Sequence, residues 1–455
     1  MVAHVLRLRF SLDPLIAEAK RRARRRRVQL VMMACVLVAA AAAATIAFTP
    51  IGLVATGHGY AGPYVPGGMF RGVGGPMPMQ EVGGTVSTVS VASSSDAWAV
   101  GSIAWHWDGH AWRNVPLPRV SAANLWAVAA DRADDAWAVG ARGNGNLTRS
   151  MALVEHWDGA HWRVASLPRL PASYLFGIST AGPRSAWAVG GTFARNRAGR
   201  FVSSMSRPLL LHWDGRSWHE QSLPWASPGL VLDTVVATGP SSVWAIASGQ
   251  QDSGRPVVME YWNGVSWRAA PSPFGAKDPF GGFSATAWDD AWAVGAYGQG
   301  GNEVTKFSHA LAAHWNGHRW QMTPLPNPQS NDNSFALMSV TAARPDYVIA
   351  LGEMQSLTMQ GNNGVSATGP VSYFLRWNGQ NWQVMPGTTP PIYEGFPAVS
   401  AGRDGSAWMV GNCQQDDFLV RLTADGWVTA PHPIDAHWAP GRGTPHGLPS
   451  CSPQG

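Results

Sequence analysis

Four histidines, each directly before a Trp-Asp-Gly or Trp-Asn-Gly sequence, are the most obvious side chains with chemistry to offer. They are His106, His156, His212 and His314. Imidazole is a common metal ligand and general base. However, these four positions recur at intervals of about fifty residues, so they belong to separate copies of one unit, and Tyr261 and Arg376 stand at the same place in two further copies. Equivalent positions of a repeat cannot share one ion, and we interpret the histidines as structural.

An acidic or amide residue follows each of these tryptophans and stands before a glycine. These residues are Asp108, Asp158, Asp214, Asn263, Asn316 and Asn378. Asp and Asn before Gly favour tight turns because their side chains hydrogen-bond the backbone two residues further on. We therefore predict that they shape turns rather than take part in catalysis.

Polar clusters in three variable loops are the remaining candidates for ligand binding. The first is Arg195, Arg197 and Arg200, whose guanidinium groups could hold a carboxylate or phosphate in a bidentate manner. The others are the pairs Asn302/Glu303 and Asp416/Asp417, whose oxygen atoms could contribute to a calcium site. The alternative for all seven is a solvated loop, and no spacing typical of a calcium loop supports a metal.

The sequence contains no nucleophile elbow, no phosphate-binding glycine loop and no His-Glu-x-x-His helix. We therefore predict no catalytic residues, no metal and no cofactor.

A hairpin, written six times with one spacing, must position the histidines and the turn residues. Its two tryptophans are always five residues apart, as in Trp107/Trp112, with Asp-Gly or Asn-Gly after the first. A two-residue loop that starts at the glycine places residue i opposite residue i+5, so the two indoles face each other. Glycine fits because tight hairpin turns need positive φ.

A second motif, Ala-Trp-Ala-Val-Gly, precedes each hairpin. It occurs at 97–101, 136–140, 186–190 and 291–295, with variants at 243–247 and 407–411 and a degenerate copy at 347–352. A short strand of small residues comes before it, and a seventh, eroded hairpin covers 422–427. Four strands in each of seven units predict an all-β fold, a seven-bladed β-propeller over residues 82–433. Six or eight blades remain open if the sixth unit or the linker is misread.

These repeats resemble bacterial surface propellers with Ala-Trp-Ala-Val-Gly and Trp-Asp-Gly-x-x-Trp motifs, a group similar to kelch-like and galactose-oxidase-like propellers. The resemblance covers roughly residues 82–433 and implies a propeller architecture. It implies little about chemistry, because that broad group includes both enzymes and binding modules. The sialidase Asp box, the WD repeat and the kelch diglycine all differ from the motifs in this chain.

The region before the repeats predicts a membrane anchor. Residues 1–27 carry nine Arg and Lys side chains against Asp13 and Glu18, and residues 28–48 are an apolar run of 21 residues, enough to cross a bilayer. The positive-inside rule places residues 1–27 in the cytoplasm and the rest outside the cell. A cleaved secretory signal is the alternative. Residues 49–81 are rich in Gly and Pro and are predicted to be a linker, and residues 434–455 a C-terminal tail.

The basic N-terminus also explains the net charge of +5, because it leaves the remaining chain with a net charge of −2. A nucleic-acid partner is therefore not predicted. Of the three cysteines, Cys413 and Cys451 could form a disulfide if the tail folds back on the last repeat.

The variable loops after the Ala-Trp-Ala-Val-Gly strands should share one rim of the ring, opposite the uniform Gly turns, and function usually resides on such loops. We expect a single-pass membrane protein whose extracellular propeller is a binding or scaffolding module for a protein or surface polysaccharide, and not an enzyme. The main alternative is an anchored or secreted glycosidase or lyase. A further alternative is a sensor that passes an external signal to a cytoplasmic partner through residues 1–27.

Overall fold

The computed structural model describes residues 86–429 apart from short internal gaps. The gaps are 144–149, 196–200, 224–229, 250–256, 276–277, 279, 301–306, 327–332, 361–363, 368–370, 386–397, 414–415 and 424–425. The chain divides into two compact units, Met1–Tyr64 and Val65–Gly455, and every described strand belongs to the second. The predicted cytoplasmic segment, membrane span, linker and C-terminal tail lie outside the described residues. Within those residues, no helix is long and apolar enough to span a membrane.

The described residues form strands that group into seven sheets, here called blades 1 to 7. Blade 1 contains β1 (Val86–Ser93), β2 (Asp96–Gly101), β3 (Ala104–Trp107) and β4 (Trp112–Val115), and blade 2 contains β5 (Ala123–Arg132), β6 (Asp135–Arg142), β7 (Met151–Trp157) and β8 (Trp162–Val164). Blade 3 contains β9 (Ser173–Thr180), β10 (Ala186–Arg195), β11 (Phe201–Trp213) and β12 (Trp218–Glu220), and blade 4 contains β13 (Leu230–Gly239), β14 (Ser242–Gly249), β15 (Val258–Trp262) and β16 (Trp267–Ala270). Blade 5 contains β17 (Phe280–Ala287), β18 (Asp290–Gly300), β19 (Phe307–Trp315) and β20 (Trp320–Met322). Blade 6 contains β21 (Asn333–Arg344), β22 (Tyr347–Gln360), β24 (Val371–Trp377) and β25 (Trp382–Val384), with β23 (Gly364–Ala367) paired to the end of β22, and blade 7 contains β26 (Ala398–Ala401), β27 (Ala407–Cys413), β28 (Asp416–Thr423) and β29 (Gly426–Thr429).

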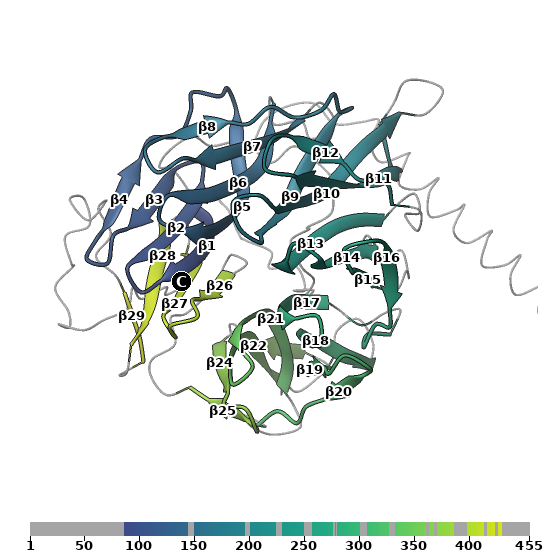
Figure 1. Ribbon diagram of the computed structural model, residues 1–455. Coiled ribbons are helices and arrows are strands. Elements are labelled where there is room, and N and C mark those ends of the chain that lie inside the picture. The colour runs from purple at the N-terminus through teal and green to yellow at the C-terminus, as the bar shows by residue number, and fades with distance from the viewer. Residues whose placement is uncertain are drawn as a thin grey trace, which may run out of the picture. The chain divides into compact units, whose positions relative to one another are not determined.

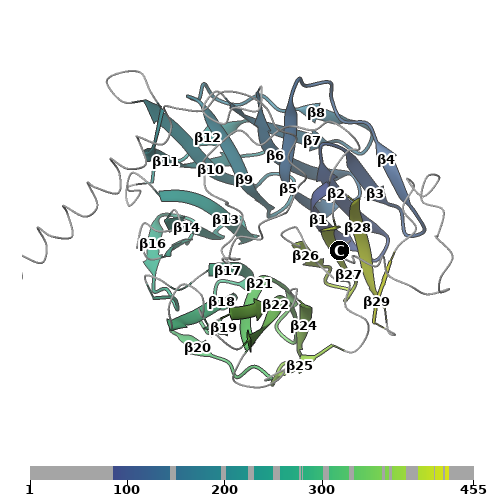
Figure 2. The same ribbon diagram turned by 180° about the vertical axis from the view of Figure 1, so that it is seen from behind.

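Each blade is an antiparallel sheet made from consecutive segments of one repeat, and its four main strands are called a to d in chain order. The a strands of neighbouring blades contact one another all the way round, and β26 of blade 7 contacts β1 of blade 1. In Figures 1 and 2 these a strands surround the centre of the ring. The all-β, seven-bladed propeller is therefore confirmed. Among the described strands no blade includes a strand from another repeat, so the ring closes through contacts between blades 7 and 1 and not through a shared sheet.

Hydroxyl groups on the a strands link neighbouring blades. Ser90 Oγ of blade 1 accepts a hydrogen bond from the backbone N–H of Ala130 in blade 2, at 3.0 Å. Four further links follow the same pattern, namely Ser179 to Ala237, Ser284 to Ala342, Thr341 to Ala401 and Ser400 to Val91. The last of these joins blade 7 to blade 1. These serines and this threonine of the a strands therefore satisfy backbone N–H donors of the adjacent blade.

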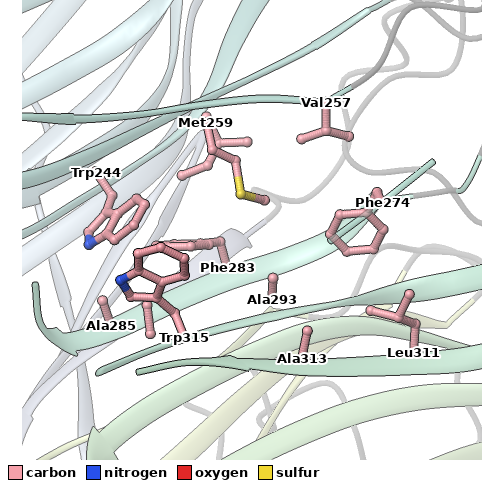
Figure 3. Close-up of a cluster of buried hydrophobic side chains, with 12 residues drawn as sticks. Trp244, Val257, Met259, Phe274, Phe283, Ala285, Ala293, Leu311, Ala313 and Trp315 are labelled. Atoms are coloured by element: carbon pink, nitrogen blue, oxygen red, sulfur yellow. The ribbon is translucent and has the colours of Figure 1, made fainter. Parts of the chain in front are cut away.

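Tryptophans fill the spaces between blades. The indole of Trp98, on β2, lies 4.9 Å from that of Trp157 and 5.0 Å from that of Trp162 in blade 2, the second contact being edge-on. The same triad, one strand-b indole against two hairpin indoles of the next blade, recurs with Trp137, Trp187, Trp292 and Trp408. Between blades 4 and 5, Trp244 contacts Trp315 and Phe283, as Figure 3 shows. Offset and edge-on aromatic pairs stabilise a core beyond the area that they bury.

A close approach between strands a and b explains the glycine at the end of the Ala-Trp-Ala-Val-Gly motif. A Cβ atom on Gly140 would lie 1.9 Å from the carbonyl oxygen of Asn124, and one on Gly190 would lie 2.0 Å from that of Tyr174. The pairing of strands a and b shifts register at this point in both blades. A β-bulge thus brings strand a too close for a side chain.

Candidate functional site

The structure does not test whether the loop residues proposed from the sequence lie close together. Arg195 is the last residue of β10, and Asp416 and Asp417 begin β28, but their side chains are outside the description. Arg197, Arg200, Asn302 and Glu303 lie outside the described residues. Cys413 ends β27, and its proposed disulfide partner Cys451 also lies outside. All these assignments stay predictions.

The histidines before tryptophan are packing residues. The His156 ring is stacked on the indole of Trp137, with centroids 4.0 Å apart, and its Nε2 lies 2.8 Å from Asp135 Oδ1. His106 and His314 repeat this arrangement on Trp98 and Trp292, with Asp96 and Asp290 as partners. His212 stacks on Trp187, and Ser185 takes the place of the aspartate. Each imidazole is held inside its own blade, which supports the structural interpretation over a shared metal site.

The residues after the first hairpin tryptophan are turn residues, as predicted. Asp108 Oδ1 accepts hydrogen bonds from the backbone N–H groups of His110 and Ala111, and Gly109 has a φ of 91°. These backbone donors, with the Arg113 side chain, lower the pKa of Asp108. The register places Trp107 opposite Trp112, so the indoles face each other across the hairpin. The asparagines accept the same two hydrogen bonds in blades 4 to 6.

The two rims of the ring differ in the way that the repeats predict. The c–d hairpins and the a–b turns lie together, because Trp107 Nε1 donates to the carbonyl of Ser94 and Trp157 Nε1 to that of Ala133. We call this side the turn rim. On the other side, the b–c connection is only two residues long in blade 1, between Gly101 and Ala104. In blade 6, β22 continues to Gln360 and forms an additional hairpin with β23. We call this side the loop rim.

One interface between blades lacks the tryptophan triad. Between blades 6 and 7 the register places Ile349 at the strand-b tryptophan position, because it pairs with Arg376 as Trp98 pairs with His106. Leu422, opposite Trp427, takes the place of the first hairpin tryptophan. Trp427 remains and packs on Phe374, with ring centroids 4.8 Å apart. Two indoles of the usual triad are therefore replaced by aliphatic side chains.

A cavity of about 470 Å³ opens at this interface on the turn rim. Its lining residues are Tyr347, Arg376, Gln383, Val384, Met385, Gly405, Leu422, Thr423 and Gly426. Cavities that bind small ligands or side chains commonly have volumes of about 300–1,000 Å³. The volume is therefore sufficient to receive a ligand group.

Tyr347 and Arg376 lie on the polar side of this cavity, and Arg344 lies against the Tyr347 ring without lining the cavity. The guanidinium carbon of Arg376 lies 4.6 Å from the centre of the Tyr347 ring, and that of Arg344 lies 5.1 Å from it. The Tyr347 hydroxyl donates to the carbonyl of Gly405, and burial raises the pKa of Tyr347. Arg344 pairs with Asp346 and donates to the carbonyl of Arg403, whereas Arg376 is exposed and has no carboxylate partner among the described residues.

Two buried glutamates, Glu155 and Glu260, do not line the cavity and were not proposed from the sequence. Glu155 is on β7 and Glu260 is on β15, and each pairs with the central alanine of its strand b. Burial raises the pKa of each carboxyl to about 7. Glu155 is 1% exposed, and its Oε2 has no hydrogen-bond partner among the described residues. The two groups lie in blades 2 and 4 and therefore do not form a catalytic pair.

The residues around the cavity were not proposed from the sequence, although a signal existed. The sixth copy of the strand-b motif is degenerate, the seventh hairpin is eroded, and Arg376 stands where other copies have histidine. Because strand b of one blade packs on the hairpin of the next, departures in two consecutive repeats affect a single interface. That relation is visible only when the packing between blades is known.

Comparison with known proteins shows no family for this chain. No protein-family profile and no curated protein sequence matches the chain. Among solved structures, YCF48 from Cyanidioschyzon merolae is similar at 12% identity and a TM-score of 0.42, covering 79% of this chain and 98% of that one. A GH74 xyloglucanase from Xanthomonas campestris is 17% identical with a TM-score of 0.48, covering 77% of this chain and 53% of the enzyme. The six-bladed fucose-binding lectin of Aleuria aurantia is 12% identical with a TM-score of 0.38, covering 67% of this chain and 93% of the lectin.

Proposed function

We propose that this chain is a membrane-anchored extracellular binding module, whose loop rim contacts a protein or a surface polysaccharide. The observation that carries the proposal is the contrast between the two rims. Six of the seven hairpins on the turn rim have the same Trp-Asp-Gly or Trp-Asn-Gly turn, whereas the b–c connections range from two residues in blade 1 to the additional β22–β23 hairpin in blade 6. Loops that vary on a rigid scaffold are the usual place for recognition.

An enzyme such as a glycosidase or lyase is the second candidate, and the described side chains support it less. A glycosidase needs two carboxyl groups about 5–10 Å apart on either side of the scissile bond. Glu155 and Glu260, whose pKa values are raised, are buried in different blades. Serines of the inner wall, such as Ser90 and Ser400, accept hydrogen bonds from neighbouring backbones instead of pointing at a substrate.

The test is binding of the full chain, in lipid nanodiscs, to arrays of surface polysaccharides and of extracellular protein fragments. We expect a specific ligand whose binding is lost when the b–c connection of blade 3 (residues 196–200) or that of blade 6 (residues 361–370) is replaced by alanine. The control is Arg163→Gln on the turn rim, which should leave binding unchanged. Ligand binding that survives every loop-rim replacement would show that this rim is not the recognition surface. Turnover of a bound glycan would instead favour the enzyme.

The anchor is tested separately by extraction of cell membranes at alkaline pH. A chain held by residues 28–48 stays with the membrane, and its N-terminal sequence remains intact. Release of a shortened chain that begins after residue 48 would mean that the segment is a cleaved secretory signal.

A further inference from the structure

The cavity between blades 6 and 7 lies where two consecutive repeats depart from the common pattern. At five of the other interfaces one strand-b indole and two hairpin indoles fill this space, and between blades 4 and 5 the two hairpin indoles pack against Trp244 and Phe283. Here Ile349 and Leu422 stand at two of the three indole positions. Ile349 is buried in the core, whereas Leu422 lines a cavity that opens beside Arg376. Loss of two packing residues from adjacent repeats costs core stability. A gain in binding is a physical reason for a protein to retain such a gap.

Arg376 is arranged to bind an anion. The Tyr347 ring lies against its guanidinium group at 4.6 Å and limits its motion, while the side chain remains exposed. At the equivalent position of blade 7, Arg421 lies over the indoles of Trp107 and Trp408 and is used in packing between blades. Arg376 has neither an indole beneath it nor a carboxylate partner in the described part of the chain. A guanidinium fork of N–H donors matches the two oxygen atoms of a carboxylate.

The rest of the lining favours a peptide over a sugar. Val384, 49% exposed, and the partly buried Met385 and Leu422 provide aliphatic surface next to the charge. Sugars commonly bind on an accessible aromatic face, but the Tyr347 ring is 5% exposed and lies against two guanidinium groups. In addition, β25 is an edge strand that pairs only with β24, so it offers backbone groups to an extended chain.

We propose that this cavity, on the turn rim, binds an acidic peptide segment in which a Glu or Asp carboxylate pairs with Arg376 and a neighbouring aliphatic side chain packs on Val384, Met385 and Leu422. The site is separate from the loop rim, and it stands whether or not the loop rim binds a glycan.

The experiment measures the binding of a fluorescently labelled hexapeptide with alternating glutamate and leucine, by polarisation, to the full chain in nanodiscs. We expect Arg376→Gln to weaken binding by about 10- to 100-fold, the usual loss for a charge-assisted hydrogen bond. A hexapeptide with glutamine in place of glutamate should lose a similar factor. Arg163→Gln, which removes the same charge from the turn rim of blade 2, should bind the acidic peptide like the unchanged chain.

A second variant tests the cavity itself. Leu422→Trp restores the indole that other hairpins carry, so it should fill the cavity, abolish peptide binding and leave the melting temperature equal or higher. The proposal is overturned if the acidic peptide does not bind, if Arg376→Gln or Leu422→Trp binds it normally, or if an oligogalacturonate binds there in its place. Loop-rim variants that lose a glycan should keep the peptide, so failure of one site is distinguishable from failure of the other.

Discussion

The imidazole of His156 lies flat on the indole of Trp137, and its Nε2 is 2.8 Å from the carboxylate of Asp135. The three residues come from adjacent strands of one blade, and the indole in turn contacts Trp213 and Trp218 of the next. His156, an imidazole that could serve as a catalyst or metal ligand, thus stabilises the packing of its own blade and of the interface with the next.

Replacement of Trp137 by alanine should strongly destabilise the propeller. The side chain is buried at the interface between blades 2 and 3, and loss of a large core aromatic residue costs about 3–5 kcal/mol in the free energy of unfolding. Trp288→Ala is the matched control, because Trp288 is in an a–b turn and 47% exposed. Denaturant titration should show a much smaller loss for this variant. Equal losses would mean that the triads do not determine stability.

His156→Ala should destabilise the propeller by about 1–3 kcal/mol, because it leaves the carboxylate of Asp135, only 4% exposed, without its imidazole partner. His212→Ala should cost less, since the His212 ring is 3.5 Å from a serine hydroxyl and not from a carboxylate. Thermal melts with and without a chelator complete the test. A chelator that lowers the melting temperature of the unchanged chain, and not that of His156→Ala, would instead identify the histidine as a metal ligand.

The buried glutamates should make the propeller less stable as the pH rises. Burial raises the pKa of Glu155 to about 7 in the folded chain, against 4.5 for an ordinary glutamate. Between these two values the unfolded chain loses its proton first, so the free energy of unfolding falls from pH 4.5 to about 7 and then levels off.

Glu155→Gln should flatten this pH dependence, and the double replacement of Glu155 and Glu260 should flatten it further. The measurement is the melting temperature from pH 5 to 8 at constant ionic strength. A pH dependence that is the same in both variants and in the unchanged chain would show that these carboxyls do not titrate in this range.

Gly140→Ala should be more harmful than Gly182→Ala, although only Gly182 has a positive φ, of 100°. A Cβ on Gly140 would overlap the Asn124 carbonyl, whereas one on Gly182 would meet nothing within 4 Å and would suffer only the backbone strain of about 1–2 kcal/mol. The measurement is the free energy of unfolding of each variant, which should fall further for Gly140→Ala. Blade 4 has Ala247 at the equivalent position, so a smaller effect than Gly182→Ala would mean that strand a can move aside in blade 2 as well.

Ser400→Ala should weaken closure of the ring. Its hydroxyl accepts from the backbone N–H of Val91, and removal of the acceptor leaves that donor unpaired at a cost of about 1–3 kcal/mol. Hydrogen exchange should then be faster at Val91 in β1 than at Ala342 in β21, whose partner Ser284 is unchanged. Uniform protection in both strands would show that this contact does not hold blades 7 and 1 together.

The hairpins and the number of blades could be predicted from the sequence because both depend on short-range spacing. Two residues five apart around an Asp-Gly or Asn-Gly turn face each other in any antiparallel hairpin, so Trp107 and Trp112 could be paired before their surroundings were known. A unit of four strands cannot bury both faces alone, and seven such units therefore predict a ring. The turn role of Asp108 and the structural role of His156 follow from the same repetition.

The partners of these residues were decided only by the tertiary structure, because they come from different repeats. Trp98 meets Trp157 and Trp162 of the next blade, and Ser400 meets Val91 at the far end of the chain. The cavity beside Arg376 is lined by Tyr347 of one repeat and Leu422 of the next. Contacts between blades join residues tens to hundreds of positions apart, and local spacing carries no information about such pairs until the ring has brought them together.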